Sequence, residues 1–306
     1  MGTIGELGEF GLIGRLTRRL PQGPAVRLGP GDDAAVIAAP DGRVVATTDL
    51  LVEGRHFRLD WSGPYDIGRK AAAQNLADVV AMGANPTALL VGFAAPPATG
   101  AGWAERLYDG LADECRAAGA SVAGGDVVGA PQITLAITAL GDLGGAAPLT
   151  RSGARPGDVV AVRGRLGFAA AGLALLEAGR DGPEELIAAH RRPEPPYTAG
   201  EEARTHGATA LLDVSDGLVQ DLAHIAVASG VRIDLDTASV PVPEILGPDG
   251  LRRVLTGGED HAFAGTYPAD AALPPSWRRI GTVAEGAGVR VDGGPPPPGA
   301  WDHFPG

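Results

Sequence analysis

Short apolar or alternating runs, which are typical of strands, are interspersed along the whole chain with longer segments of helical spacing. In the first half we expect strands at Val44–Leu51, Thr87–Ala94 and Gln132–Leu140. We expect helices at Gly102–Ala118 and at Pro64–Met82, the latter beginning near Ser62 and ending at Gly83. This alternation predicts a mixed α/β architecture.

The composition changes at the stretch GDLGGAAPLTRSGARPGD, whose glycines and prolines suit a connection between domains. At roughly 100–200 residues per domain, the length of 306 residues also favours two domains. We therefore expect one α/β domain at residues 1–148 and a second at residues 149–306. In the second domain we expect strands and helices at Asp158–Val162, Leu166–Ala178, Ala208–Leu212 and Leu218–Ala228.

The charge balance excludes one class of partner. The chain has 25 Lys and Arg against 37 Asp and Glu, a formal net charge of −12. A nucleic-acid-binding surface needs a net basic face, so nucleic acid is not an expected partner. No apolar run reaches the roughly 18 residues of a membrane-spanning helix, and acids stand where a signal peptide carries positive charge. We expect a soluble, cytoplasmic protein with no membrane partner.

Several common catalytic motifs are absent from the sequence. Lys70 is the only lysine and there is no GxxxxGK(S/T) segment, which excludes a Walker-type phosphate loop. The single cysteine, Cys115, excludes a disulfide framework and a CxxC zinc site. Its neighbours show helical periodicity, so we interpret it as an ordinary helix position rather than a nucleophile. The GxSxG and HExxH motifs are also missing.

Six short segments place Asp or Glu beside glycines or at the ends of expected strands. They are GPGDDAAV, TTDLLVEGRHF, NLADVVAMGA, AGGDVV, LLDVSDG and TGGEDHAF. Each segment alone is more often a turn or a helix cap than a metal site. Together they indicate converging carboxylates, which repel one another unless cations lie between them. Magnesium, which prefers oxygen ligands and usually keeps waters and phosphates, is the expected cation.

One helix carries a polar series on a single face. Lys70, Gln74 and Asp78 are spaced four residues apart in the helix expected from Pro64. A solvated ladder of polar side chains explains this spacing as well as a functional site does. Chemistry performed by cations and positioning, with little covalent work by the protein, is typical of phosphoryl transfer. The residues alone therefore predict a metal-dependent enzyme that acts on phosphates, and they leave its substrate open.

Taken in order, a set of strings resembles the thiamine-monophosphate kinase family: GEFGLIGRL, GPGDDAAV, TTDLLVEGRHF, KAAAQNLADVVAMGA, GGD, LTRSGARPGD, DVSDGLVQDLAHI, TGGED and WDHF. They extend from Gly8 to Phe304, and the ordered set is far more specific than any one string. The resemblance implies a two-domain fold like that of aminoimidazole ribonucleotide synthetase, with an N-terminal α/β domain that dimerises through its sheet. It also implies that ATP binds in a cleft lined by aspartates and several magnesium ions.

The resemblance further implies direct in-line transfer of the γ-phosphoryl group of ATP to thiamine monophosphate, giving thiamine diphosphate and ADP. The implied catalytic residues are Asp49, Asp126, Asp213 and Arg151. The positions that match magnesium ligands are Asp33, Thr47, Thr48, Asp49, Asp78, Asp126, Asp213 and Asp216. Contacts to ATP are implied for Gly125, Asp126, Arg151 and Ser215, and contacts to the thiamine phosphate for His56, Glu259 and Trp301.

These implied roles agree with the chemistry of the side chains. Arg151 can bind a phosphate through two parallel hydrogen bonds, and Trp301 offers an aromatic face to a cationic heteroaromatic ligand. His56 can hydrogen-bond the acceptor. Each residue also has a structural interpretation: a surface arginine in a linker, a tail residue packed on the core, and a strand-end histidine whose hydrogen bonds are satisfied.

The sequence departs from the family pattern at a few positions beside the carboxylates. Val127 and Val128 stand where two threonines usually follow GGD, so hydroxyl contacts near the nucleotide are expected to be absent. His261 and Ala262 stand where Tyr and Glu are common. Ala77 replaces the usual serine before the helix aspartate. None of these changes removes a carboxylate.

Three related enzymes and one binding protein are the alternatives. Selenophosphate synthetase relies on an N-terminal Lys and Cys or selenocysteine, and residues 1–30 contain neither Lys nor Cys. The hydrogenase-maturation dehydratase ends in a catalytic cysteine, whereas this chain ends in DHFPG. The ribonucleotide synthetase, a ligase, carries a DGVGTK-like segment in place of TTDLLVEGRHF and is the least excluded of the three. A non-catalytic nucleotide-binding relative would have lost several carboxylates, and all are present here.

Overall fold

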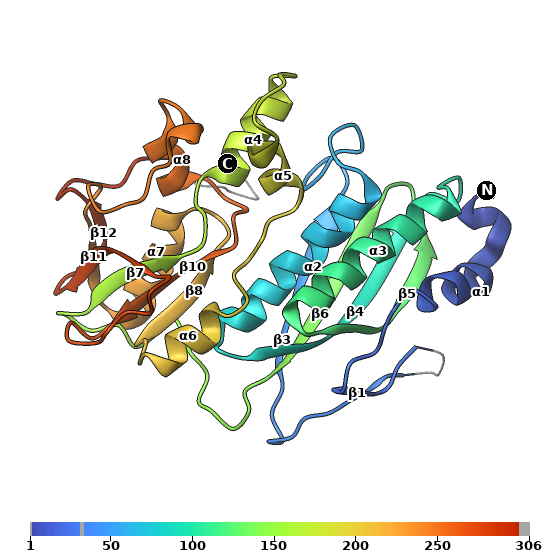
Figure 1. Cartoon of the computed structure of the whole chain (residues 1–306), viewed down its shortest axis with the longest axis horizontal. Coiled ribbons are helices and arrows are strands. Elements are labelled where there is room, and N and C mark those ends of the chain that lie inside the picture. The colour runs from blue at the N-terminus through green and yellow to red at the C-terminus, as the bar shows by residue number, and fades with distance from the viewer. Residues whose placement is uncertain (1, 31–33, 300–306) are drawn as a thin grey trace. The chain divides into compact units, whose positions relative to one another are not determined.

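The computed structural model describes residues 2–30 and 34–299, and the contacts of the chain divide it into two compact units. Unit 1 consists of Met1–Val79 and Ala84–Ala146. Unit 2 consists of Val80–Gly83 and Ala147–Gly306. Each unit combines a β-sheet with helices (Figure 1), which confirms the predicted mixed α/β architecture.

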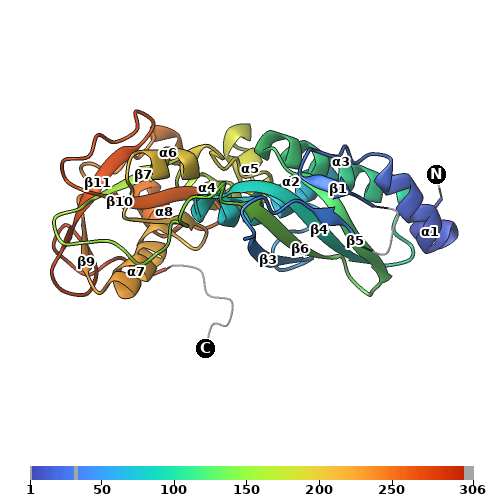
Figure 2. The same cartoon turned by 90° about the horizontal axis from the view of Figure 1, so that it is seen from below.

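A four-stranded sheet in the order β3-β6-β4-β5 forms the centre of unit 1. Its strands are β3 (Val45–Val52), β4 (Asn85–Ala95), β5 (Ser121–Gly129) and β6 (Thr134–Asp142). Strand β6 pairs antiparallel with both β3 and β4, whereas β4 and β5 are parallel. Helices α2 (Pro64–Ala81) and α3 (Ala101–Ala118) cover one face of this sheet (Figure 2).

Helix α3 contributes a continuous apolar stripe to the core of unit 1. Ala104, Leu107, Leu111 and Cys115 recur at helical spacing and are all buried. Burial raises the pKa of the Cys115 thiol well above its ordinary value, which disfavours the reactive thiolate. Cys115 is thus a core position, as predicted.

The segment before the sheet forms a helix and a small hairpin. Helix α1 (Ile4–Thr17) begins with a capping box, in which the Thr3 side chain and the Glu6 side chain each bond the other residue's backbone. Strands β1 (Val26–Leu28) and β2 (Val36–Ile37) pair antiparallel in a separate two-stranded sheet.

Unit 2 is built on a six-stranded sheet in the order β12-β9-β11-β7-β10-β8. Its strands are β7 (Val159–Arg163), β8 (Ala210–Val214), β9 (Arg232–Leu235), β10 (Ala262–Tyr267), β11 (Arg278–Ala284) and β12 (Gly288–Val291). Its helices are α4 (Phe168–Glu177), α5 (Glu184–Arg191), α6 (Ala199–Thr205), α7 (Leu218–Ser229), the 3-10 turn η1 (Glu244–Leu246) and α8 (Gly250–Thr256). Apolar side chains of the sheet and helices form one continuous core.

The nine segments for which the sequence predicts a helix or strand all have the predicted type, with their ends within two residues of the predicted ones. The pattern missed α1, the strands β1, β2, β5 and β9 to β12, and the short helices α5, α6, η1 and α8. None of the helices in the described residues is long and apolar enough to cross a membrane.

Candidate active site

Two of the expected site residues, Asp33 and Trp301, lie outside the residues that the structure describes. The others fall into groups in unit 1 and in unit 2, and each group is described within its own unit.

In unit 1 the structure brings together residues of β3 and α2. Thr47 Oγ1 donates a hydrogen bond to Asp78 Oδ2 over 2.9 Å. The backbone N–H of Asp49 donates to Asn75 Oδ1 over 3.0 Å. Alternate residues of a strand share a face, so Thr47 and Asp49 both point toward the helix that carries Asp78. This arrangement places hydroxyl and carboxylate oxygens along one sheet–helix contact.

Thr48 does not join this group, because its side chain points to the opposite face of β3. Its hydroxyl donates to the backbone oxygen of Ile137 on β6 over 2.8 Å. The structure therefore separates the two neighbouring threonines that the sequence analysis placed together.

The polar series on α2 is not a solvated ladder. Lys70 is buried, and its Nζ donates to the backbone oxygen of His56 over 3.2 Å. The His56 ring in turn accepts a hydrogen bond at Nδ1 from the Val52 N–H over 3.0 Å. An accepting Nδ1 leaves the proton of the neutral ring on Nε2. His56 is thus a strand-end histidine held in a defined orientation, with a donor on its other nitrogen.

Gly125 and Asp126 lie on β5, at the opposite edge of the sheet from β3. A Cβ on Gly125 would lie 2.0 Å from the backbone oxygen of Val91, so only glycine fits here. The Asp126 side chain is exposed and accepts a hydrogen bond from the Val127 N–H over 2.8 Å. In the register of the sheet, Asp126 pairs with Gly92 on β4, which is aligned through β6 with Leu50 on β3 and not with Asp49. The described part of unit 1 therefore does not bring Asp126 and Asp49 together.

In unit 2, the segment 257–261 packs against the segment 213–217, where β8 leads into α7. The Glu259 N–H donates to the Ser215 carbonyl oxygen over 2.7 Å. The His261 N–H donates to the Val214 carbonyl oxygen over 2.9 Å. The His261 Nδ1 lies 3.1 Å from Asp213 Oδ2, and both side chains are buried. The antiparallel pairing of β8 with β10 thus gathers Asp213, Ser215 and Glu259 at one place.

The acidic character of this group is visible in Asp221, on the first turn of α7. Its Oδ2 accepts the N–H groups of Asp216 and Gly217, at 3.1 and 3.0 Å. Burial, followed by the negative charge of Asp213, raises the pKa of the Asp221 carboxyl to about 7. Negative charge is therefore in excess here, and the donors are hard oxygens, which is the environment that a magnesium ion fits.

In the described residues, no three His, Cys, Asp or Glu side chains are already arranged to hold a metal ion. Magnesium is commonly bound through one or two carboxylates and completes its shell with waters and phosphate oxygens. The pairs seen here suit that mode of binding and do not form an all-protein cage.

Two further residues lie beside the site: His190, which had no signal in the sequence, and Asp260, which belongs to the acidic segment TGGEDHAF. His190 on α5 is buried, and its Nδ1 lies 3.4 Å from Glu259 Oε2. Asp260 is buried, and its carboxylate accepts the N–H groups of Gly167 and Ala169 at the start of α4, at 2.5 and 2.9 Å. Both residues fix the segment that carries Glu259.

Arg151 lies on the surface of unit 2, and its backbone oxygen accepts a hydrogen bond from Ser229 Oγ over 3.0 Å. An exposed guanidinium on an anchored backbone suits a phosphate clamp and equally suits a surface arginine.

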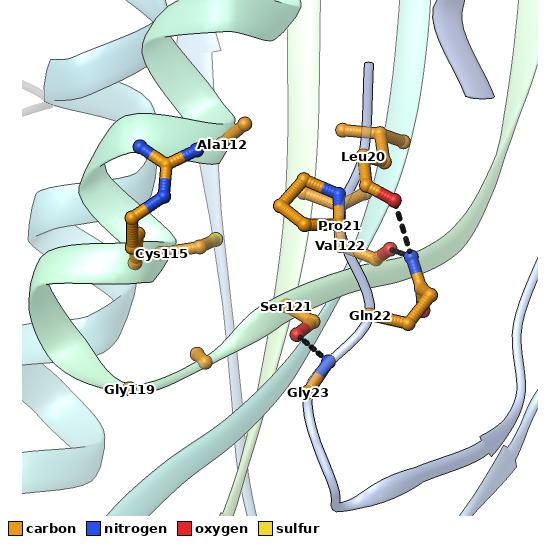
Figure 3. Close-up of a pocket in the computed structure, with 11 residues that line it drawn as sticks. Leu20, Pro21, Gln22, Gly23, Ala112, Cys115, Gly119, Ser121 and Val122 are labelled. Atoms are coloured by element: carbon orange, nitrogen blue, oxygen red, sulfur yellow. Dashed lines mark hydrogen bonds between the residues drawn. The ribbon is translucent and has the colours of Figure 1, made fainter. Parts of the chain in front are cut away.

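A separate pocket of about 230 Å³ lies in unit 1, between Leu20–Gly23, the C-terminal end of α3 and the start of β5 (Figure 3). Gln22 Nε2 spans it by donating to the backbone oxygens of Leu20 and Val122, and the Gly23 N–H donates to Ser121 Oγ (Figure 3). None of the expected site residues that the structure describes lines this pocket. It is therefore distinct from the acidic groups described above.

Comparison with known proteins identifies the family. The sequence profile described as AIR synthase related protein, N-terminal domain, matches residues 31–143, and the corresponding C-terminal domain matches residues 155–294. A thiamine-monophosphate kinase of Mycobacterium tuberculosis is 50% identical over 300 residues, covering 95% of this chain and 90% of that protein.

Solved structures agree with the sequence matches. The crystal structure of thiamine-monophosphate kinase from Stenotrophomonas maltophilia has a TM-score of 0.82 and 34% identity, covering 92% of this chain and 96% of the other. AaThiL complexed with AMPPCP and TMP has a TM-score of 0.81 and 33% identity, covering 98% of both chains. The chain therefore belongs to the thiamine-monophosphate kinase family.

Proposed function

We propose that this chain transfers the γ-phosphoryl group of ATP to thiamine monophosphate, producing thiamine diphosphate and ADP. The observation that carries this proposal is the end-to-end match to AaThiL, which was solved with AMPPCP and TMP and covers 98% of both chains. The oxygen donors Thr47 and Asp78 in unit 1, and Asp213 in unit 2, suit the same reaction, in which the protein needs no nucleophile of its own.

The proposed transfer is direct. Phosphoryl transfer of this kind needs positioning and electrostatic stabilisation more than covalent work by the protein. Cys115 is buried with its thiol pKa raised, so it is unsuited to attack a phosphate. Arg151, at the surface, is proposed to clamp the nucleotide together with Gly125, Asp126 and Ser215.

Magnesium is the proposed metal, with several ions per active site. Thr47, Asp49, Asp78 and Asp126 would hold it in unit 1, Asp213 and Asp216 in unit 2, and Asp33 completes the proposed set. Thr48 is left out of this set because its hydroxyl is bonded to Ile137 on the other face of β3. When bound, the metal neutralises charge on the phosphate oxygens during transfer. His56, whose ring has its proton on Nε2, is proposed to donate a hydrogen bond to the thiamine phosphate, and Glu259 and Trp301 are proposed to hold the same ligand.

The two expected domains have different proposed roles. We propose that residues 1–148 carry most of the ATP and magnesium contacts, and that residues 149–306 complete the active site. The carboxylate groups of β3 and α2 support the first assignment, and the Asp213–His261 pair supports the second.

We also propose a homodimer formed through the sheet of unit 1. In the described residues of this unit no helix covers the face opposite α2 and α3 (Figure 2). Leu50 on β3 and Val128 on β5 are each 57% exposed and share that face by strand register. A second copy packed on this face would bury these apolar side chains. Burial of apolar surface contributes about 25 cal/mol of free energy per Å² removed from water.

The direct test incubates the purified protein with ATP, magnesium and thiamine monophosphate and follows thiamine diphosphate by chromatography. We expect product that depends on magnesium and disappears with EDTA. A sample that binds ATP but forms no product would contradict the proposal. Formylglycinamidine ribonucleotide is then the substrate that tests the ligase alternative, and inertness toward it would leave a nucleotide-binding protein.

A further inference from the structure

His261 has an unusual backbone conformation for a residue with a large side chain. Its φ angle is +49°, in the left-handed region that residues other than glycine seldom adopt. Glu259, two residues before it, also has a positive φ of +65°. Backbone strain of this kind persists only where the surroundings hold it in place, and it is concentrated at functional sites.

The surroundings hold this segment from two sides. On one side the Asp260 carboxylate accepts the N–H groups of Gly167 and Ala169. On the other side, the N–H of Glu259 donates to the carbonyl oxygen of Ser215, and that of His261 to Val214. The result of this anchoring is a fixed position for the His261 ring, which is buried beside the end of β8.

The His261 ring contacts a residue of the proposed active site. Nδ1 lies 3.1 Å from Asp213 Oδ2, with side-chain exposures of 7% and 6%. An ionised carboxylate can only accept, so Nδ1 carries the proton and donates it. The carboxylate of Asp213 therefore has one oxygen, Oδ2, whose position is fixed by His261.

We propose that His261 is a positioning residue for Asp213: it fixes the orientation of the carboxylate and so prepares it to bind a divalent cation. This inference rests on the proposed function for the ligand role of Asp213. Residues that orient a metal ligand commonly change the metal affinity 10- to 100-fold when they are removed.

Asparagine and glycine variants differ in whether the hydrogen-bond donor to Asp213 is kept. His261→Asn keeps an N–H donor close to the place of Nδ1, and asparagine tolerates positive φ. His261→Gly removes the donor and relieves the strain at φ +49°. Both variants lose the imidazole ring, but only the glycine variant loses the donor, so the change in Mn²⁺ affinity is compared between the two and set against the change in thermal stability of each.

The experiment measures binding of Mn²⁺ alone to the full chain by electron paramagnetic resonance, with thermal unfolding as a check of the fold. We expect His261→Gly to bind Mn²⁺ about 10-fold more weakly than the wild type. We expect His261→Asn to remain within about threefold of the wild type, because the donor is kept. In an Asp213→Asn background, His261→Gly should have no further effect, since the group that it orients is gone.

Equal Mn²⁺ affinity in the wild type and His261→Gly would overturn the inference, as would an Asn variant as weak as the Gly variant or a wild type that binds no Mn²⁺. The kinase assay tests the proposed function, and the Mn²⁺ measurement tests the role of His261, so either claim can be refuted without the other. Product formation with equal Mn²⁺ affinities would refute the role of His261 and leave the proposed function. No product with the expected order of affinities would refute the function and leave the role of His261 in binding the cation.

Discussion

Thr47 on β3 and Asp78 on α2 are joined by a hydrogen bond of 2.9 Å, in which the threonine hydroxyl donates to the carboxylate. This bond links a sheet edge to the helix that covers it and fixes one oxygen of a proposed magnesium ligand. Thr47→Val keeps the shape and removes the donor. We expect the magnesium concentration for half-maximal turnover to rise about 10-fold, because an unoriented ligand binds more weakly.

Thr87→Val is the matched control for that change. Thr87 lies on β4 of the same unit and donates to the backbone oxygen of Leu140 over 3.0 Å, away from the expected ligands. It should lose a similar amount of stability without changing the magnesium dependence. Identical magnesium dependence in both variants would contradict the role given to Thr47.

His190 is expected to act on the acceptor side of the reaction. Its Nδ1 lies 3.4 Å from Glu259 Oε2, so the ring limits the positions of that carboxylate. We expect His190→Ala to raise the KM for thiamine monophosphate about 10-fold and to leave the KM for ATP nearly unchanged. Steady-state kinetics with each substrate varied in turn measures both values. A rise in the KM for ATP alone would be inconsistent with this role.

Asp260 should make folding stability depend on pH. Burial raises the pKa of its carboxyl from the ordinary value of 3.8 to about 7, against the opposing effects of the Ala169 and Gly167 N–H groups and the charges of His261 and Arg165. Between about pH 4 and pH 7 the folded state holds a proton that the unfolded state has lost. Stability from this group is therefore complete below about pH 4 and falls as the pH rises toward 7.

Asp260→Asn removes that dependence and one of the two hydrogen bonds to the start of α4. We expect the variant to be less stable than the wild type by about 1–3 kcal/mol at pH 5. The difference should be smaller at pH 8, where the wild type has lost the contribution of the protonated carboxyl. Urea unfolding at pH 5 and pH 8 measures this difference in stability. A difference that is larger at pH 8 than at pH 5 would contradict the prediction.

The proposed dimer makes a prediction about Leu50. Leu50→Glu places a charge on the open face of the sheet and should convert the dimer to a monomer in analytical ultracentrifugation. Val227→Glu is the control, because Val227 is 80% exposed on α7 in unit 2. A wild-type chain that sediments as a monomer, or a Leu50 variant that remains dimeric, would exclude this face as the interface.

The sequence predicts the elements whose pattern is local and strong. Helix α2 and strand β3 follow from regular apolar spacing between clear stop signals, and both agree with the structure. Strand β5 was missed because its GlyGlyAsp segment has low strand propensity. The glycine is needed there for a non-local reason: the backbone of Val91 on β4 approaches too closely for any side chain at position 125.

The same distinction applies to the site. Asp49, Asp78 and Asp213 stand out because acids beside strand ends form short readable motifs. His190 does not stand out, and His261 does so only as a departure from the family pattern, since their contacts with Glu259 and Asp213 depend on chain pairing between distant residues. Thr48 is the opposite case. It follows Thr47 directly in the sequence, but successive side chains of a strand point to opposite faces, so Thr48 bonds Ile137 and lies away from the Thr47 group.

The central claim, that the acidic groups carry phosphoryl transfer, is tested most directly by turnover of purified Asp49→Asn and Asp126→Asn. Thiamine diphosphate formation and thermal unfolding are measured on the same samples. We predict a loss of turnover of at least about 100-fold in each variant, with unfolding temperatures close to that of the wild type. Near-normal turnover in both folded variants would contradict the claim.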